Sequence, residues 1–151
     1  MIVRKFTSVA FSLLLVAYSF AAQKDLVKLK ADAEKARGGH QAKLYAELAD
    51  RLVDVADQAF NQGDSNQAQA TVEEILKDAI KAHDGALATR DNRKEVEIYL
   101  RLTQRHLESV KQTLASDDRP PLDAVEAKLA ELRQDLLDSM FAPNGKKKDP
   151  K

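Results

Sequence analysis

The chain of 151 residues contains no cysteine and no tryptophan, and it has only five glycines and four prolines. Without cysteine there is no disulfide, no thiol nucleophile and no covalent haem attachment through a Cys-x-x-Cys-His motif. Four of the eight aromatic residues lie within the first 21 residues. The rest of the chain therefore has few side chains on which a sugar or a nucleic-acid base stacks.

Residues 1–21 have the pattern of a secretory signal. Arg4 and Lys5 precede an apolar run from Phe6 to Phe20, and Ser19 and Ala21 are small residues of the kind that a signal peptidase requires. That run of 15 residues is shorter than the roughly 20 that span a membrane. We expect export to the periplasm or the exterior of a bacterial cell, with cleavage after Ala21 and no stable membrane insertion afterwards. An uncleaved anchor is the alternative.

The charge after residue 21 is nearly balanced, with 22 basic and 24 acidic residues. Proteins dedicated to nucleic acid normally carry a strong basic excess, so we expect no nucleic-acid partner. The segment from Leu44 to Asp84 is acidic, with 9 acids and 3 bases. It favours a basic protein partner. Residues 142–151 carry a net charge of +3, with helix breakers and almost no apolar side chain, which predicts a disordered basic tail.

From Gln23 onward, apolar residues recur every three or four positions, which is typical of amphipathic helices. The sequence predicts one all-α domain over residues 22–141. A first helix should end or kink at Gly38-Gly39. Further helices are expected from about His40 to Gln62, from just after Gly63 to a stop at Asp84-Gly85, from between Ala86 and Asn92 to about Ala115, and from Leu122 to about Phe141.

The last two predicted helices each carry an apolar stripe with alternating spacings of four and three, which is a heptad pattern. The loop Ser116 to Pro121 between them contains two prolines, which interrupt helices. We expect these helices to form an antiparallel hairpin and to bury their stripes against each other and against the preceding pair. The predicted fold is a bundle of antiparallel helical hairpins, and burial of both stripes predicts a monomer.

The middle of the chain has a Gly63-Asp64 turn, and Asp64 followed by Gln67 predicts a capping box. Large and small residues surround this turn at regular positions: Leu52, Val55, Ala56, Phe60, Ala68, Val72 and Ile75. On these residues, the region from about residue 49 to 84 resembles the tetratricopeptide repeat (TPR), a 34-residue helix-turn-helix unit. The resemblance implies a helical hairpin of the kind that binds proteins. The chain departs from the family pattern in having Leu52 at an aromatic position, no proline after the second helix and one repeat where a stack needs about three.

The sequence offers few candidates for chemistry. Its histidines, His40, His83 and His106, do not show the spacing of a zinc motif, and Met140 continues an apolar stripe. Three aspartates, Asp50, Asp54 and Asp57, share one helix face, and we interpret them as solvated charges. We therefore expect no catalytic, cofactor-binding or metal-binding residue and no enzyme activity. The expected function is an exported protein-protein interaction module or scaffold of unknown partner. The alternative is a bundle whose histidines converge on a metal or a haem.

Overall fold

The computed structural model describes residues 22–142, which form helices and turns and contain no strand. The N-terminal helix covers residues 22–35. The other elements are α2 (Gly38–Asn61), α3 (Ser65–Thr89), α4 (Arg93–Thr113), the short 3₁₀ helix η1 (Ser116–Asp118) and α5 (Pro120–Phe141). The predicted all-α class is confirmed. The predicted signal segment and nearly all of the predicted tail lie outside the described residues.

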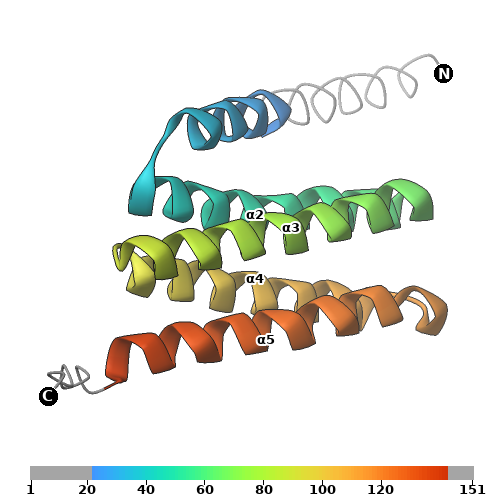
Figure 1. Ribbon diagram of the computed structural model, residues 1–151. Helices are drawn as coiled ribbons and strands as arrows, with labels where there is room; N and C mark the ends of the chain where they lie inside the picture. Colours follow the sequence, from blue (N-terminus) through green and yellow to red (C-terminus); the bar gives the residue numbers. More distant parts are fainter. Residues whose placement is uncertain (1–21, 143–151) are drawn as a thin grey trace, which may run out of the picture.

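The helices form a bundle of three layers (Figure 1). α4 and α5 make one layer, α2 and α3 lie on it, and the N-terminal helix lies on the opposite side of the α2–α3 pair. Within the bundle, α2 contacts both α3 and α4, and α5 contacts both α3 and α4. The α2–α3 pair is therefore covered on one face by two helices and on the other by the N-terminal helix.

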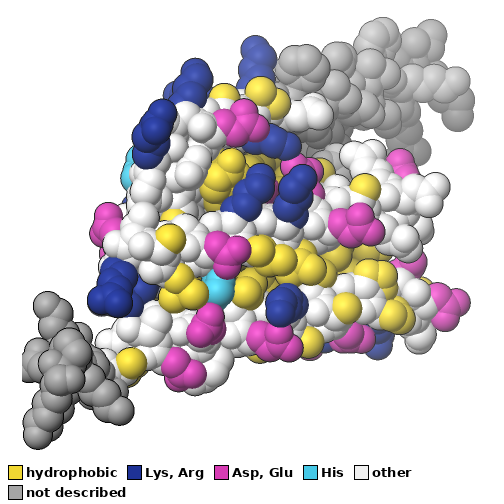
Figure 2. Space-filling view, in the orientation of Figure 1, with side chains coloured by type: hydrophobic (Ala, Val, Ile, Leu, Met, Phe, Trp, Pro, Cys, Tyr) yellow, Lys and Arg dark blue, Asp and Glu magenta, His cyan; other side chains and the backbone are white. Residues whose placement is uncertain are grey.

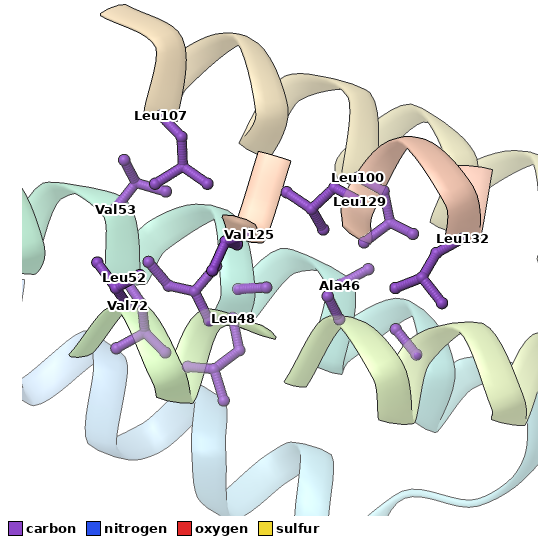
Figure 3. Close-up of a cluster of buried hydrophobic side chains, with 14 of the residues drawn as sticks. Ala46, Leu48, Leu52, Val53, Val72, Leu100, Leu107, Val125, Leu129 and Leu132 are labelled. Carbon is purple, nitrogen blue, oxygen red and sulfur yellow. The ribbon is translucent and has the colours of Figure 1, made fainter. Parts of the chain in front are cut away.

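The core lies between the α2–α3 and α4–α5 layers (Figure 3). Leu48 and Val53 of α2, Leu100 and Leu107 of α4, and Leu129 of α5 are almost fully buried there. The predicted stripes of α4 and α5 are buried along their length, apart from the partly exposed Met140 at the end of α5. Burial of such side chains, at about 1.5–3 kcal/mol each, is the main stabilising contribution.

Many of the buried residues of α2 and α3 are small. The buried alanines are Ala42, Ala46, Ala49, Ala56 and Ala59 on α2, and Ala68, Ala79, Ala82 and Ala86 on α3. Because alanine side chains are short, the two helix axes can approach closely. At Gly85 the approach is close, since a Cβ atom there would lie 3.2 Å from the Cβ atom of Ala42.

The predicted end of the third helix at Asp84-Gly85 is wrong. α3 continues through Gly85 to Thr89, and its C-terminal left-handed position is occupied by Arg90 (φ 58°). Gly85 is thus a close-packing residue and not a helix cap. α4 begins at Arg93, one residue beyond the predicted range, because Asn92 is also left-handed (φ 54°).

The Gly38-Gly39 break is confirmed. The N-terminal helix ends at residue 35, and Gly38 has a positive φ of 61°, which glycine adopts without a steric cost. Gly39 has no room for a side chain, because a Cβ atom there would lie 2.7 Å from the Cβ atom of Asp91. The start of α2 is therefore held against the α3–α4 turn.

The other two turns follow the predicted chemistry. Gly63 is left-handed (φ 75°), and the backbone N–H of Gln67 donates to Asp64 Oδ1 at 3.0 Å, which caps α3. Prolines occupy the first positions of α5, where the missing N–H has no helical partner in any case. The Arg119 guanidinium donates to the Leu114 carbonyl at 3.0 and 2.9 Å and closes the α4–α5 loop.

Candidate functional site

A cavity of about 460 Å³ opens between the start of the N-terminal helix and the C-terminal half of α2. Its apolar lining comes from Leu26, Leu52, Val55 and Ala59. Polar groups line the rest: the amides of Gln23, Gln58, Gln62 and Gln67, the Arg51 guanidinium, and the carboxylates of Asp25 and Asp54. A volume of this size holds a small molecule or a few residues of a peptide.

The four glutamine amides give this cavity a particular chemistry. Each amide carries both a donor and an acceptor, the same pair that a peptide group presents. Within the described part of the chain, none of the four side chains is engaged in a hydrogen bond. The cavity therefore offers apolar contact together with peptide-like hydrogen bonding.

The histidines lie in separate surroundings. His83 is buried between α3 and α5, with Nδ1 2.8 Å from Asp84 Oδ1 and Nε2 2.8 Å from Asp135 Oδ2. Each ring nitrogen of His83 thus lies within hydrogen-bond distance of a carboxylate, and the contact with Asp135 joins α3 to α5.

His106 of α4 faces the aspartates of α2, with Nε2 3.3 Å from Asp54 Oδ1 and Nδ1 3.9 Å from Asp50 Oδ1. Burial raises the pKa of Asp50, and the neighbouring His106 opposes that shift. Of the three aspartates interpreted as a solvated face, Asp54 is exposed, and Asp50 and Asp57 are partly exposed.

None of these histidines is joined to another by a described contact, and His40 is exposed at the start of α2. Among residues 22–142, no group of three or more histidine, aspartate or glutamate side chains is arranged to hold a metal ion. Met140, the other candidate haem ligand, is partly exposed near the end of α5.

A second, smaller depression of about 360 Å³ lies between α4 and α5. Arg101, Arg105 and Arg133 line it together with Glu108 and Glu126. Beside it, Lys111 Nζ contacts Glu108, Glu126 and Asp123 at 2.6, 2.6 and 2.9 Å, and these three carboxylates raise the pKa of Lys111. Since most of these charges already pair with one another, the side chains around the depression mainly hold α4 and α5 together.

Beneath the N-terminal helix, charged side chains of α3 form a small cluster. Lys30 Nζ donates to Glu74 Oε1 at 2.6 Å, and Lys81 Nζ lies 3.5 Å from Asp78 Oδ1 and 4.5 Å from the centre of the Tyr45 ring. The Asp78 side chain is only 3% exposed, and its Oδ2 has no hydrogen-bond partner. Burial raises the pKa of Asp78. Burying a carboxylate oxygen without a hydrogen-bond partner lowers the free energy of unfolding, so ionised Asp78 destabilises the fold.

Figure 2 shows hydrophobic side chains at the surface between the N-terminal helix and α3, with charged side chains of both signs around them. A further hydrophobic furrow follows the boundary of α3 and α5 on the same face. In the described part of the chain, no helix is both long enough and apolar enough to cross a membrane.

Comparison with known proteins gives no match: no family model, no curated protein and no solved structure resembles this chain closely enough to report.

Sequence reasoning did not predict the cavity or the buried Asp78. The glutamines at 58 and 62 were a possible signal, because a spacing of four places both amides on one helix face beside Val55 and Ala59. Their convergence with Gln23 and Gln67 depends on how the N-terminal helix lies on α2 and α3. No local pattern in the sequence encodes that placement.

Proposed function

We propose that this protein is an exported helical module that binds another protein through its acidic α2–α3 pair, which acts as a TPR-like hairpin. The observation that carries the proposal is the cavity of about 460 Å³ between the N-terminal helix and α2. Its apolar lining with four unengaged amides suits a peptide segment, which presents side chains for apolar contact and backbone groups for hydrogen bonds.

Charge favours a basic partner. The segment from Leu44 to Asp84, which includes most of α2 and α3, has 9 acids and 3 bases. Asp54 lines the cavity with its side chain 76% exposed, so its charge is available to an approaching molecule. Complementary charge mainly accelerates association and selects the partner, and its effect weakens as salt screens it.

The exported location is supported by the sequence of residues 1–21, with Arg4 and Lys5 ahead of an apolar run. The TPR-like character is supported by the Gly63-Asp64 turn, the Asp64 cap on α3 and the alanine-rich contact between α2 and α3. Small residues at the contact of paired helices are what a TPR unit uses. In this reading the module is a small scaffold or adaptor of the cell envelope.

The test is identification of a partner by cross-linking in the native envelope followed by mass spectrometry. We expect one reproducible partner with a basic contact region, captured less efficiently as salt increases. Asp54→Lys should reduce its capture at least tenfold. The matched control is Glu131→Lys on α5, whose side chain is similarly exposed at 67% and lies away from the cavity.

Two results would contradict the proposal. The first is the absence of a reproducible partner when the protein is shown by circular dichroism to be folded and helical. The second is a partner whose capture is lost with Glu131→Lys and retained with Asp54→Lys, because that would move the contact to α5.

A further inference from the structure

The N-terminal helix packs on the α2–α3 pair through one narrow side. Ala33 is fully buried, while Leu26 and Leu29 are only partly buried. These positions lie three and four residues apart, so they share one helix face. On another side of the same helix, Val27 is 67% exposed. In the described part of this helix, the fully buried side of the contact is therefore a single small residue.

Polar contacts of this helix are few. Lys30 pairs with Glu74 of α3, and both side chains are substantially exposed, at 51% and 39%. An exposed ion pair of this kind contributes little net stability. In addition, Gln41 Nε2 donates to the Ala33 carbonyl at 3.0 Å. Ala33 is thus the one fully buried side chain of the described part of this helix, and Leu26 and Leu29 are partly buried beside it.

The connection to α2 allows the N-terminal helix to move separately. Residues 36 and 37 are not helical, and Gly38 adopts a positive φ. Immediately after this hinge, Gly39 packs tightly against Asp91 and anchors the start of α2. A rotation at residues 36–38 can lift the N-terminal helix and leave α2 in place.

The α3 side chains under the helix include two carboxylates, Glu74 and Asp78, and one lysine, Lys81, which lies 3.5 Å from Asp78 Oδ1. Asp78 lies one turn from Glu74 on the same face of α3, and Lys30 is among the charges that act on it. Lys30 forms a hydrogen bond with Glu74, whereas Asp78 Oδ2 has no hydrogen-bond partner. The N-terminal helix itself is nearly neutral, with lysines at 24, 28, 30 and 35 and acids at 25, 32 and 34. A more basic helix would complement this surface better.

We propose that the α2–α3 surface beneath the N-terminal helix is the partner-binding surface, and that this helix occupies it in the free protein as an internal competitor. The partner segment is an amphipathic helix with a small side chain in the place of Ala33 and a basic side chain in the place of Lys30. This inference rests on the proposed function and adds to it the form of the partner and a means of regulation. When the helix lifts, the α2 and α3 side of the cavity stays in place, and the partner replaces the side that Gln23, Asp25 and Leu26 line.

The competition has a measurable consequence. A ligand that binds only the open form has an affinity reduced by the fraction of molecules that are open. If the surface is open in about 1–10% of molecules, which is typical of minor states, release of the helix raises the apparent affinity about 10- to 100-fold.

The probe is a fluorescent synthetic peptide with the sequence of residues 22–37, AQKDLVKLKADAEKAR. Its binding to the purified protein is measured by fluorescence anisotropy. Ala33→Glu places a charge at the buried contact and releases the helix, whereas Val27→Glu changes an exposed position of the same helix and is the matched control. We expect Ala33→Glu to bind the peptide at least tenfold more tightly than Val27→Glu and the unchanged protein.

A charge exchange tests the place of binding. In the Ala33→Glu protein, the added substitution Glu74→Lys should weaken binding of the peptide, and a peptide with Lys30→Glu should restore it. Circular dichroism verifies that each variant retains the helical bundle. Equal binding by the Ala33→Glu and Val27→Glu proteins, or no rescue by the exchanged pair, would overturn the inference.

A locked form separates this inference from the proposed function. Because the chain has no cysteine, Lys30→Cys with Glu74→Cys can be joined by a bis-maleimide without side reactions at other thiols. Because Glu74 belongs to the proposed surface, the cross-linked protein is compared with the same variant without cross-linker, and the unchanged protein is the reference for capture. We expect cross-linking to reduce capture of the envelope partner at least tenfold relative to that variant without cross-linker. Equal capture by both forms would refute the gating inference alone, whereas no capture by any form would refute the proposed function.

Discussion

Two buried carboxylates stand out among the individual residues of this protein. Asp78 Oδ2 and Glu126 Oε1 are buried without a hydrogen-bond partner among the described residues, and burial raises the pKa of both side chains. Glu126 is compensated by Lys111 at 2.6 Å, whereas the nearest cation to Asp78 is Lys81 at 3.5 Å. Asp78 is therefore the residue at which a loss of charge should improve stability.

We predict that Asp78→Asn stabilises the fold in a pH-dependent manner. Because the pKa of Asp78 is raised in the folded state, that state binds the proton more tightly than the unfolded chain. Below the unfolded pKa of about 4, Asp78 is protonated in both the folded and the unfolded state, so no charge is buried. As the pH rises from there through the folded pKa, folding buries an ionised carboxylate, and the free energy of unfolding falls. We expect a gain of about 1 kcal/mol at pH 7 in urea unfolding, which disappears near pH 3.5.

The control for Asp78→Asn is Asp117→Asn, which changes an exposed aspartate of η1. Its effect on the free energy of unfolding should stay within about 0.5 kcal/mol at either pH. A loss of stability for Asp78→Asn at pH 7 would mean that the carboxylate has a favourable partner in solution.

A second residue-scale prediction concerns Gly39. Alanine normally stabilises a helix by about 1 kcal/mol relative to glycine. At this position its Cβ atom would lie 2.7 Å from the Cβ atom of Asp91, so the α3–α4 turn must shift. We expect Gly39→Ala to lower the free energy of unfolding by about 1–2 kcal/mol. Adding Asp91→Gly, which removes the obstructing atom, should recover part of the loss, and an unchanged loss would contradict the steric explanation.

At the scale of elements, three pairs of packed helices in the bundle are joined by three different chemistries. Close alanine contacts join α2 to α3, and His83 with its two aspartates joins α3 to α5. α4 and α5 are joined by the Arg133 guanidinium, whose Nε and Nη2 donate to Glu97 Oε1 at 3.1 and 3.0 Å and whose Nη1 donates to Gln104 Oε1 at 2.7 Å. Glu97 is buried, which makes this pair important for how the two helices align.

We predict that Arg133→Leu destabilises the protein by about 3 kcal/mol, because it leaves the buried Glu97 carboxylate with only the distant Arg101 at 3.9 Å. The double substitution Glu97→Leu with Arg133→Leu should return to within about 1 kcal/mol of the parent, since no uncompensated charge remains. Guanidinium unfolding of the two singles and the double measures the coupling. The control Arg51→Leu breaks the exposed pair with Glu47 and should cost less than about 1 kcal/mol.

At the scale of the whole molecule, one core between two layers of helices supports the α2–α5 bundle, and the N-terminal helix adds a third, weakly held layer (Figure 1). The apolar stripes of α4 and α5 are buried within the chain, as expected from the apolar side that the α2–α3 pair also presents. Among the described residues, only Val27, Leu102 and Phe141 are large hydrophobic side chains with high exposure. They come from three different helices.

We predict that Leu107→Asp and Leu132→Asp unfold the bundle, because each places an unpaired charge in the core. An uncompensated buried charge costs several kcal/mol, which is a large part of a typical stability of about 5–15 kcal/mol. Circular dichroism should show loss of helix. Leu102→Asp is the matched control on α4, since Leu102 is 43% exposed, and it should remain folded.

The burial of both stripes also predicts a monomer in solution. Light scattering should give a mass of about one chain per particle, close to 16.8 kDa for the full sequence and lower after signal cleavage. A stable dimer that Leu107→Asp or Leu132→Asp converts into folded monomers would contradict this prediction, because those leucines would then lie at a subunit contact.

The sequence by itself determined the elements of this fold. Apolar spacing of three and four predicts helices, and Gly38, the Gly63-Asp64 turn and the prolines at 120 and 121 mark boundaries by local backbone chemistry. Burial of the apolar stripes of α4 and α5 was also predictable, since a stripe with heptad spacing is stable only when it packs against another helix. The end of α3 was mispredicted because a glycine serves equally as a cap or as a close contact, and only the neighbouring Ala42 distinguishes the two.

Tertiary structure decided which side chains meet. The alanines of α2 have no strong signal in the sequence, yet they are buried because α3 and α4 both pack on that helix. The cavity with its four amides, the paired histidine and aspartates, and the buried Asp78 all join residues from different helices. Local periodicity fixes which face of a helix is apolar, but the neighbour of each face depends on the packing of the whole chain, and the candidate binding surface is a product of that packing.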